Sequence, residues 1–309
     1  MAKNMGFARF TALNIIVNIT ITILYLLWCS FTGGIRQEHY YLIIIWVTAY
    51  YLSDKSRRFI LGFSIFIIYW IVYDSMRALP NYEVAQVHIK QPYDFEKFLF
   101  GINENGKLLT PNEYFINHHS PFFDILSGLF YINWVPVPLA FAVYLFFKNK
   151  YLFIKFSLVF LLVNIAGFVI YYLYPAAPPW YVNLYGFDLH LGVPGNRAGL
   201  ARFDELTGIP IFESIYNKNA NVLAAMPSLH AAYPVIVLYY GIKARLGKIN
   251  WLFLVFMLGI WFSAVYSGHH YIIDIIVGAS VALIVIFGFE SFSKSNFGNG
   301  RIQSFSEKL

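Results

Sequence analysis

The chain has 309 residues, of which 59% are hydrophobic, 20% aromatic and only 12% charged, with a mean hydropathy of +0.58. A soluble domain carries about 25% charged residues, so this composition excludes an ordinary water-soluble enzyme, a disordered chain and a nucleic-acid-binding protein. It indicates an integral membrane protein. The single cysteine, Cys29, cannot form an internal disulfide and leaves Cys-rich zinc sites without ligands.

Apolar stretches that can cross a bilayer recur along the chain. A bilayer core about 30 Å thick needs roughly 20 apolar residues in a helix. The sequence therefore predicts an all-α, polytopic membrane helix bundle with about eight transmembrane helices, at about 11–31, 39–54, 59–77, 123–147, 152–174, 228–243, 249–267 and 270–289. The second and third are short. No A-x-A-like cleavage site follows the first, so we expect a retained signal anchor, and Pro136 and Pro138 predict a kink in the fourth.

Basic residues lie on one side of this topology. If the N-terminus with Lys3 and Arg9 is inside, the short inner loops read DKSRR, KNK and KARLGK, which is a positive-inside pattern. We therefore expect cytoplasmic N- and C-termini and two large outer segments, at about 78–122 and 175–227. The net charge of +6 is then mainly an orientation signal, and it gives no evidence for an acidic partner.

The few ionisable residues near span ends are candidates for chemistry, because such groups are costly in a membrane. At the outer start of the last span, His270 and Asp274 are separated by four residues and share one helix face, whereas His269 points elsewhere. A carboxylate bonded to one imidazole nitrogen fixes the tautomer and leaves the other nitrogen as a nucleophile or base. The alternative is a buried His–Asp pair that only holds helices together.

A second histidine, His230, opens the sixth span on the same outer side. Ser228 precedes it and can cap the helix, whose first N–H groups and positive dipole end face the outer segments. Two histidines at two helix starts form a plausible anion site for a phosphoryl group. One imidazole can attack phosphorus while the other protonates the departing oxygen. Alone, His230 would more simply be an interfacial residue.

These motifs resemble those of the PAP2 superfamily and, more closely, of the fungal inositol phosphorylceramide synthases that aureobasidin A inhibits. The resemblance covers about 175–280 and rests on Ala177-Pro178-Pro179-Trp180-Tyr181, Asn183-Leu184-Tyr185-Gly186, Gly199-Leu200-Ala201-Arg202, Pro227-Ser228-Leu229-His230 and Gly268-His269-His270-Tyr271 with Asp274. It implies a six-helix catalytic core. We therefore divide the chain into N-terminal spans with an outer interfacial segment (1–122), a PAP2-like catalytic helix bundle (123–290) and a polar cytoplasmic tail (291–309).

The resemblance also implies roles for individual residues. His270 would be the nucleophile, Asp274 would orient it, and His230 would be the acid–base for the leaving and entering hydroxyls. Trp180, Tyr181, Asn183 and Ser228 would belong to the substrate site.

The sequence departs from the phosphatase pattern of the superfamily in its cations. Ser263 and Ala264 stand where the phosphatases have Ser-Arg, and the Lys-x6-Arg-Pro phosphate clamp is absent. A phosphodiester oxyanion in a low-dielectric site still needs preorganised donors. The candidates are Arg202, which we prefer because it lies in the GLAR segment, then Arg197 and Arg77. The last of these can instead pair with Asp74, three residues earlier.

The remaining polar features of the outer segments are weaker candidates. The adjacent His118 and His119 could ligate a metal but have no patterned acidic partner, so we interpret them as an interfacial loop. Asp188 and His190 could contact a polyol headgroup. The sequon that begins at Asn18 lies inside the first span and is void.

Together these observations predict a multi-pass lipid phosphotransferase with its active site on the non-cytoplasmic face, periplasmic in a bacterium and luminal in a eukaryote. It would move a phosphoinositol-type headgroup from a glycerophospholipid to a ceramide-like acceptor through a phosphohistidine-type intermediate, releasing diacylglycerol, without a metal or cofactor. The alternative is a PAP2-type lipid phosphate phosphatase that uses water, and a third hypothesis is a non-catalytic lipid-binding protein. The sequence leaves the oligomeric state open.

Overall fold

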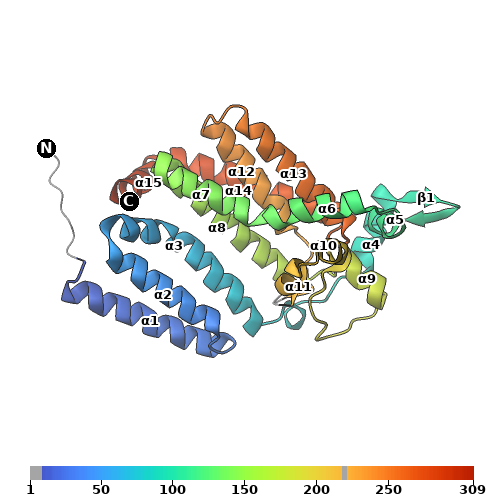
Figure 1. Cartoon of the computed structure of the whole chain (residues 1–309), viewed down its shortest axis with the longest axis horizontal. Helices are drawn as coiled ribbons and strands as arrows, with labels where there is room; N and C mark the ends of the chain where they lie inside the picture. Colours follow the sequence, from blue (N-terminus) through green and yellow to red (C-terminus); the bar gives the residue numbers. More distant parts are fainter. Residues whose placement is uncertain (1–8, 218–220) are drawn as a thin grey trace.

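The computed structural model describes residues 9–217 and 221–309, which are almost entirely helical (Figure 1). Lys3, used above for the orientation, lies outside this range. The α-helices are α1 (Ala12–Thr32), α2 (Gln37–Leu52), α3 (Asp54–Ser75), α4 (Lys90–Phe100), α5 (Pro111–Asn117), α6 (Pro121–Tyr131), α7 (Pro136–Lys148), α8 (Lys150–Leu173), α9 (Pro179–Tyr185), α10 (Ala201–Thr207), α11 (Ile211–Tyr216), α12 (Leu229–Lys243), α13 (Ile249–Tyr266), α14 (Ile272–Lys294) and α15 (Asn296–Lys308). Four 3-10 turns are η1 (Met76–Ala78), η2 (Asn81–Glu83), η3 (Ile132–Trp134) and η4 (Ala198–Leu200). Strands β1 (Ile102–Glu104) and β2 (Lys107–Leu109) form a small antiparallel hairpin.

An all-helical, multi-pass membrane architecture is confirmed. In the described part of the chain, five helices are long and apolar enough to cross a membrane, namely α1, α3 with η1, α8, α13 and α14. The pair α6 and α7 passes the same test as one span bent by 43°. This bend confirms the predicted kink, because Pro136 begins α7 and lacks the N–H that would continue α6. At 1.5 Å per residue, α2 and α12 are about 24 Å and 22 Å long, which is less than a bilayer core.

The core of the bundle is centred on α12. This helix packs against α7, α8, α13 and α14, and α8 in turn contacts α3 and α15. Aromatic rings fill much of the interface, with the largest buried side chains from α8 and α12 being Phe153, Phe156, Tyr233 and Tyr240. Helices α1 to α3 flank this bundle on one side, and α1 keeps a largely exposed apolar surface suited to lipid contact (Figure 1).

The two ends of the bundle differ in character (Figure 1). The short helices α4, α5, α9, α10 and α11 and the hairpin gather at one end, whereas α15 lies at the other. The segment 291–309 comprises the end of α14, up to Lys294, and α15 from Asn296, and Ile302 and Leu309 are buried against the bundle.

A buried ion cluster lies at the α15 end of the bundle. The carboxylate of Glu290 on α14 accepts a hydrogen bond from Lys155 Nζ at 2.6 Å, and it also pairs with Lys243 and Tyr240. Lys155 and Glu290 are only 3% and 6% exposed. Such a cluster is tolerated because each charge is paired.

Candidate active site

The turn between α13 and α14, residues 267–271, carries the predicted nucleophile. The backbone N–H groups of His269 and His270 both donate to the carbonyl oxygen of Ala264 at 3.0 Å. Gly268 has a φ of +75°, a left-handed conformation that glycine adopts without steric cost. The turn therefore folds back on the end of α13 and directs the two histidine rings into the bundle.

His270, His230 and Asp274 lie together as predicted, but His270 precedes α14, which begins at Ile272, so it does not share a helix face with Asp274 as we expected. His230 Nδ1 and His270 Nε2 are 3.0 Å apart, and His270 Nδ1 is 3.5 Å from Asp274 Oδ2. Asp274 is fully buried and its Oδ2 also accepts the backbone N–H of Tyr271 at 2.9 Å. A carboxylate facing Nδ1 favours the proton on that nitrogen, so Nε2 of His270 keeps its lone pair on the side of His230.

The partner histidine is positioned by the start of α12. Ser228 caps this helix by accepting from the Ala231 N–H, and its own N–H donates to the Asp274 carbonyl oxygen at 2.9 Å. That hydrogen bond joins the starts of α12 and α14, which explains why two histidines 40 residues apart meet. The His230 ring also contacts Tyr131 Oη at 3.3 Å. Ser228 is fully buried, so its observed role is a helix cap.

His269 is turned away from the pair, as expected. Its Nε2 faces the Arg197 carbonyl oxygen at 3.0 Å, and its ring stacks on Tyr216 with centroids 4.4 Å apart. Burial, reinforced by the neighbouring His270, lowers the pKa of His269 to about 3. A ring that stays neutral and donates to a carbonyl is a structural contact, not a proton shuttle.

The motif segments of the second outer segment hold the turn through main-chain atoms. Trp180 N donates to Gly268 O at 3.0 Å, and Gly199 N donates to Ser267 O at 2.8 Å. A Cβ at Gly199 would lie 2.9 Å from the Ser267 Cα, closer than such atoms pack. Glycine is therefore required where the two backbones meet.

Two residues that sequence reasoning missed also hold this region. Asn112 Nδ2 donates to the carbonyl oxygens of Val265 and His270, at 2.8 and 2.9 Å. The fully buried Glu96 accepts the N–H groups of Ile272 and Ile273, the first two residues of α14, at 2.9 and 3.1 Å. Burial raises the pKa of Glu96 to about 7, although the two N–H groups oppose this shift. The capping pattern Thr110-Pro111-Asn112-Glu113 signals a helix start but not these partners.

The three predicted clamp arginines have different surroundings. Arg202 donates to Asp124 Oδ1 at 2.6 Å and lies over the Tyr266 ring. Its Nη2 is buried and, within residues 9–217 and 221–309, has no hydrogen-bond partner. Arg197 pairs with Asp204 at 3.2 Å and thereby braces α10.

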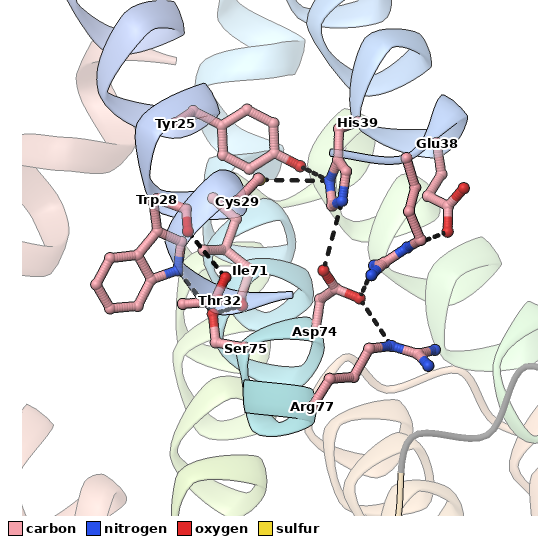
Figure 2. Close-up of polar contacts among 11 residues, drawn as sticks. Tyr25, Trp28, Cys29, Thr32, Glu38, His39, Ile71, Asp74, Ser75 and Arg77 are labelled. Carbon is pink, nitrogen blue, oxygen red and sulfur yellow. Dashed lines mark hydrogen bonds and ion pairs between the residues drawn. The ribbon is translucent and has the colours of Figure 1, made fainter. Parts of the chain in front are cut away.

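Arg77 lies in a separate polar cluster at the end of α3 (Figure 2). Its Nε donates to Asp74 Oδ1 at 3.2 Å, which confirms the predicted pair. Asp74 also pairs with Arg36 and faces His39, whose Nδ1 contacts Tyr25 Oη at 2.8 Å. Figure 2 shows that these groups converge from α1, α2 and α3, so the cluster joins the three N-terminal helices.

The other predicted residues lie at the end of the bundle that carries the turn 267–271. Tyr181 is buried, and its hydroxyl accepts the His190 N–H at 2.7 Å and donates to Asp188 O at 3.1 Å, which braces the loop from within. Asn183 and Trp180 border a cavity discussed below.

The loop histidines of the first outer segment are paired with acids. His118 contacts Glu104 at 3.1 Å and His119 contacts Asp124 at 3.5 Å. In the part of the chain that the structure describes, no three His, Cys, Asp or Glu side chains are grouped so that they could hold a metal ion.

Comparison with known proteins adds independent information. Residues 108–288 match the PAP2 superfamily. The chain is 48% identical over 271 residues to a Bacteroides thetaiotaomicron protein named phosphoinositol dihydroceramide synthase, covering 86% of this chain and 88% of that one. It is 26% identical over 250 residues to the Candida albicans inositol phosphorylceramide synthase, covering 79% of this chain and 50% of the relative. No solved structure matches.

Proposed function

Because this chain belongs to the PAP2 superfamily, we propose that it transfers phosphoinositol from a glycerophospholipid to the primary hydroxyl of a dihydroceramide-type lipid. The observation that carries the proposal is the His230–His270 contact at 3.0 Å, with Asp274 behind His270. The name of the Bacteroides relative supports the choice of phosphoinositol and dihydroceramide.

In the first half of the reaction, the donor phosphodiester enters between the two imidazole rings. His270 Nε2 attacks phosphorus, and the bond from phosphorus to the glycerol oxygen breaks. His230 gives its proton to that oxygen, so diacylglycerol leaves and the phosphoinositol group stays on His270. Asp274 holds the His270 tautomer and stabilises the positive ring that forms.

In the second half, the acceptor hydroxyl loses its proton to His230 and its oxygen attacks phosphorus. The bond from phosphorus to His270 breaks, and both histidines return to their starting state. Arg202 is our proposed partner for the phosphodiester charge, because its Nη2 has no hydrogen-bond partner among the described residues. A site that limits water favours the lipid alcohol over hydrolysis.

The proposal is tested with purified protein, phosphatidylinositol and dihydroceramide. We expect His270→Ala and His230→Ala to abolish transfer, and Asp274→Asn to lower it by at least about 100-fold. Phosphatidylinositol labelled at phosphorus should leave an acid-labile label on the wild-type protein but not on His270→Ala. Transfer at the wild-type rate by His270→Ala would contradict the mechanism. Release of inorganic phosphate from a lipid phosphomonoester in the absence of acceptor would instead identify the phosphatase alternative.

We also propose that α2, the bent pair α6–α7 and α12 cross the membrane, which gives eight spans. We propose further that the turn 267–271, here called the catalytic turn, faces the non-cytoplasmic side. The basic loops around Lys150 and Lys248 support this orientation, because they lie far along the spans from the turn. In a Cys29→Ser background, Glu205→Cys should react with an impermeant maleimide on intact cells and Lys248→Cys should not. The reverse labelling would overturn the orientation.

A further inference from the structure

A cavity of about 520 Å³, lined by both polar and apolar residues, lies beside the catalytic turn. Its walls come from α4 and α5 on one side and from α9 and α10 on the other. The turn itself supplies Ser267, Gly268 and Tyr271. The volume lies within the range of about 300–1,000 Å³ that small-molecule sites occupy. His230 and His270 do not line this cavity, so it is distinct from the space between the two rings.

Three buried polar atoms of cavity-lining residues lack a hydrogen-bond partner in the described ranges. They are Asn112 Oδ1, Arg202 Nη2 and Tyr271 Oη. Asn112 and Tyr271 are only 5% and 1% exposed. Buried polar groups are normally satisfied, and leaving one unpaired costs free energy. Three such atoms around one cavity therefore point to a polar ligand that completes them.

The chemistry of the lining defines the ligand class. The unpaired atoms comprise an acceptor, a charged donor and a hydroxyl that can do both, so the ligand must offer donors and acceptors together. Glu113 lies 3.7 Å from Lys97, and Arg202 Nη2 is the proposed partner of the phosphodiester of the same lipid, which leaves Asn112 and Tyr271 for its headgroup. A neutral ring with several hydroxyl groups fits this lining better than a phosphate dianion.

The cavity is linked directly to the nucleophile. Asn112 lines the cavity, and its Oδ1 has no hydrogen-bond partner among the described residues, while its Nδ2 donates to the His270 carbonyl oxygen at 2.9 Å. Tyr271 immediately follows His270. A ligand that bonds to Asn112 and Tyr271 would thus fix the two groups next to the nucleophile.

We propose that this cavity is the subsite for the inositol ring of the donor phospholipid. This assignment rests on the proposed function, and it adds Asn112 and Tyr271 to Asn183 as residues that recognise the donor. Free inositol offers the same hydroxyl chemistry as the lipid headgroup, so both should bind.

The Tyr271→Phe variant tests the subsite cleanly. It removes a hydroxyl that makes no hydrogen bond in the described structure, so the fold loses no internal partner. We expect the KM for phosphatidylinositol to rise about 3- to 10-fold, as for one lost neutral hydrogen bond, with the KM for dihydroceramide unchanged. Tyr144→Phe on α7, outside the cavity, makes the same chemical change and should alter neither constant. An unchanged donor KM in Tyr271→Phe would overturn the proposal.

A binding measurement separates this proposal from the proposed function. In a His270→Ala background, phosphatidylinositol in nanodiscs should raise the thermal unfolding temperature, and the added Asn183→Ala change should weaken that effect. Phosphatidylglycerol is the headgroup control. Competition between free inositol and the lipid would indicate that the protein recognises the inositol ring itself. Lipid binding that is unaffected by both inositol and Asn183→Ala would refute the subsite. If wild type binds the lipid as described but does not transfer it, only the proposed function fails.

Discussion

A single methyl group added at Gly278 should separate His230 and His270, the two histidines of the proposed reaction. Gly278 lies on α14 one turn after Asp274 and packs directly against the backbone of Ser228, which caps α12. A Cβ at this position would be 2.9 Å from the Ser228 carbonyl carbon and 3.2 Å from its nitrogen, and closer still to its carbonyl oxygen. The obstacle is backbone, so no side-chain rotation can relieve it.

The size of the effect follows from these contacts. Non-bonded carbon atoms rest about 3.5–4.0 Å apart, so α12 and α14 must separate by roughly 1 Å in Gly278→Ala. That shift stretches the Ser228 N–Asp274 O hydrogen bond of 2.9 Å and the His230–His270 contact of 3.0 Å. A misplacement of about 1 Å can cost about 100-fold in rate, and overpacking costs about 1–3 kcal/mol of stability.

The assay compares two alanine variants of the same helix. Transfer of phosphoinositol should fall about 100-fold in Gly278→Ala, whereas Gly288→Ala should retain the wild-type rate because a Cβ there meets nothing within 4 Å. Both variants gain the same helix propensity, so the difference isolates the steric contact. If Gly278→Ala folds and transfers phosphoinositol at the wild-type rate, the close packing of α12 against α14 does not determine the distance between His230 and His270.

Three further predictions follow from other buried groups. Glu290→Gln should lower the free energy of unfolding by about 3–5 kcal/mol, because Lys155 is left buried without its carboxylate, and an unchanged unfolding temperature in detergent would contradict this. Burial raises the pKa of Glu96 from 4.5 to about 7. The protonated form of Glu96 therefore stabilises the folded protein. This contribution is complete below pH 4.5 and is lost as the pH rises through 7. Glu96→Gln should therefore gain up to about 3 kcal/mol over wild type between pH 5 and pH 8, and equal pH profiles of thermal unfolding would refute this sign. His269→Gln keeps a donor for its carbonyl partner and should retain most of the transfer rate, while His270→Gln should lose it; comparable losses in the two would show that His269 has a chemical role.

The sequence predicted contacts that are local or that share a helix start, and it missed those that depend on tertiary packing. His270 lies in the turn just before α14 and Asp274 in the first turn of that helix, so their contact is local in sequence even though they do not share a helix face. Asn112 reaches the His270 carbonyl across 158 residues of sequence, and Glu96 reaches Ile272 across 176. No periodicity encodes such pairs.

The predicted side of the membrane alone did not distinguish Arg77 from Arg202 as the residue that binds the phosphodiester. Arg77, at the end of the third predicted span, and Arg202, in the predicted outer segment 175–227, both lie on the outer side in the predicted topology. Arg77 belongs to the cluster around Asp74, whereas Arg202 borders the cavity. The sequence did not fix the number of transmembrane helices, for a similar reason. Hydropathy marks apolar runs, but it does not show whether a 15-residue helix such as α12 spans the bilayer or ends within it.

The catalytic turn is held mostly by main-chain atoms, from Trp180 N, Gly199 N and the Ala264 carbonyl oxygen. Hydrogen bonds of this kind do not depend on the identity of the side chains that carry them. Most residues that line the cavity can therefore be exchanged without moving the nucleophile. The exceptions are Asn112, whose side chain does both, and Gly199 and Gly268, whose backbones need glycine. Headgroup preference and bond-making chemistry are thus separable in this architecture, so a redesigned donor specificity need not begin by rebuilding the reaction centre.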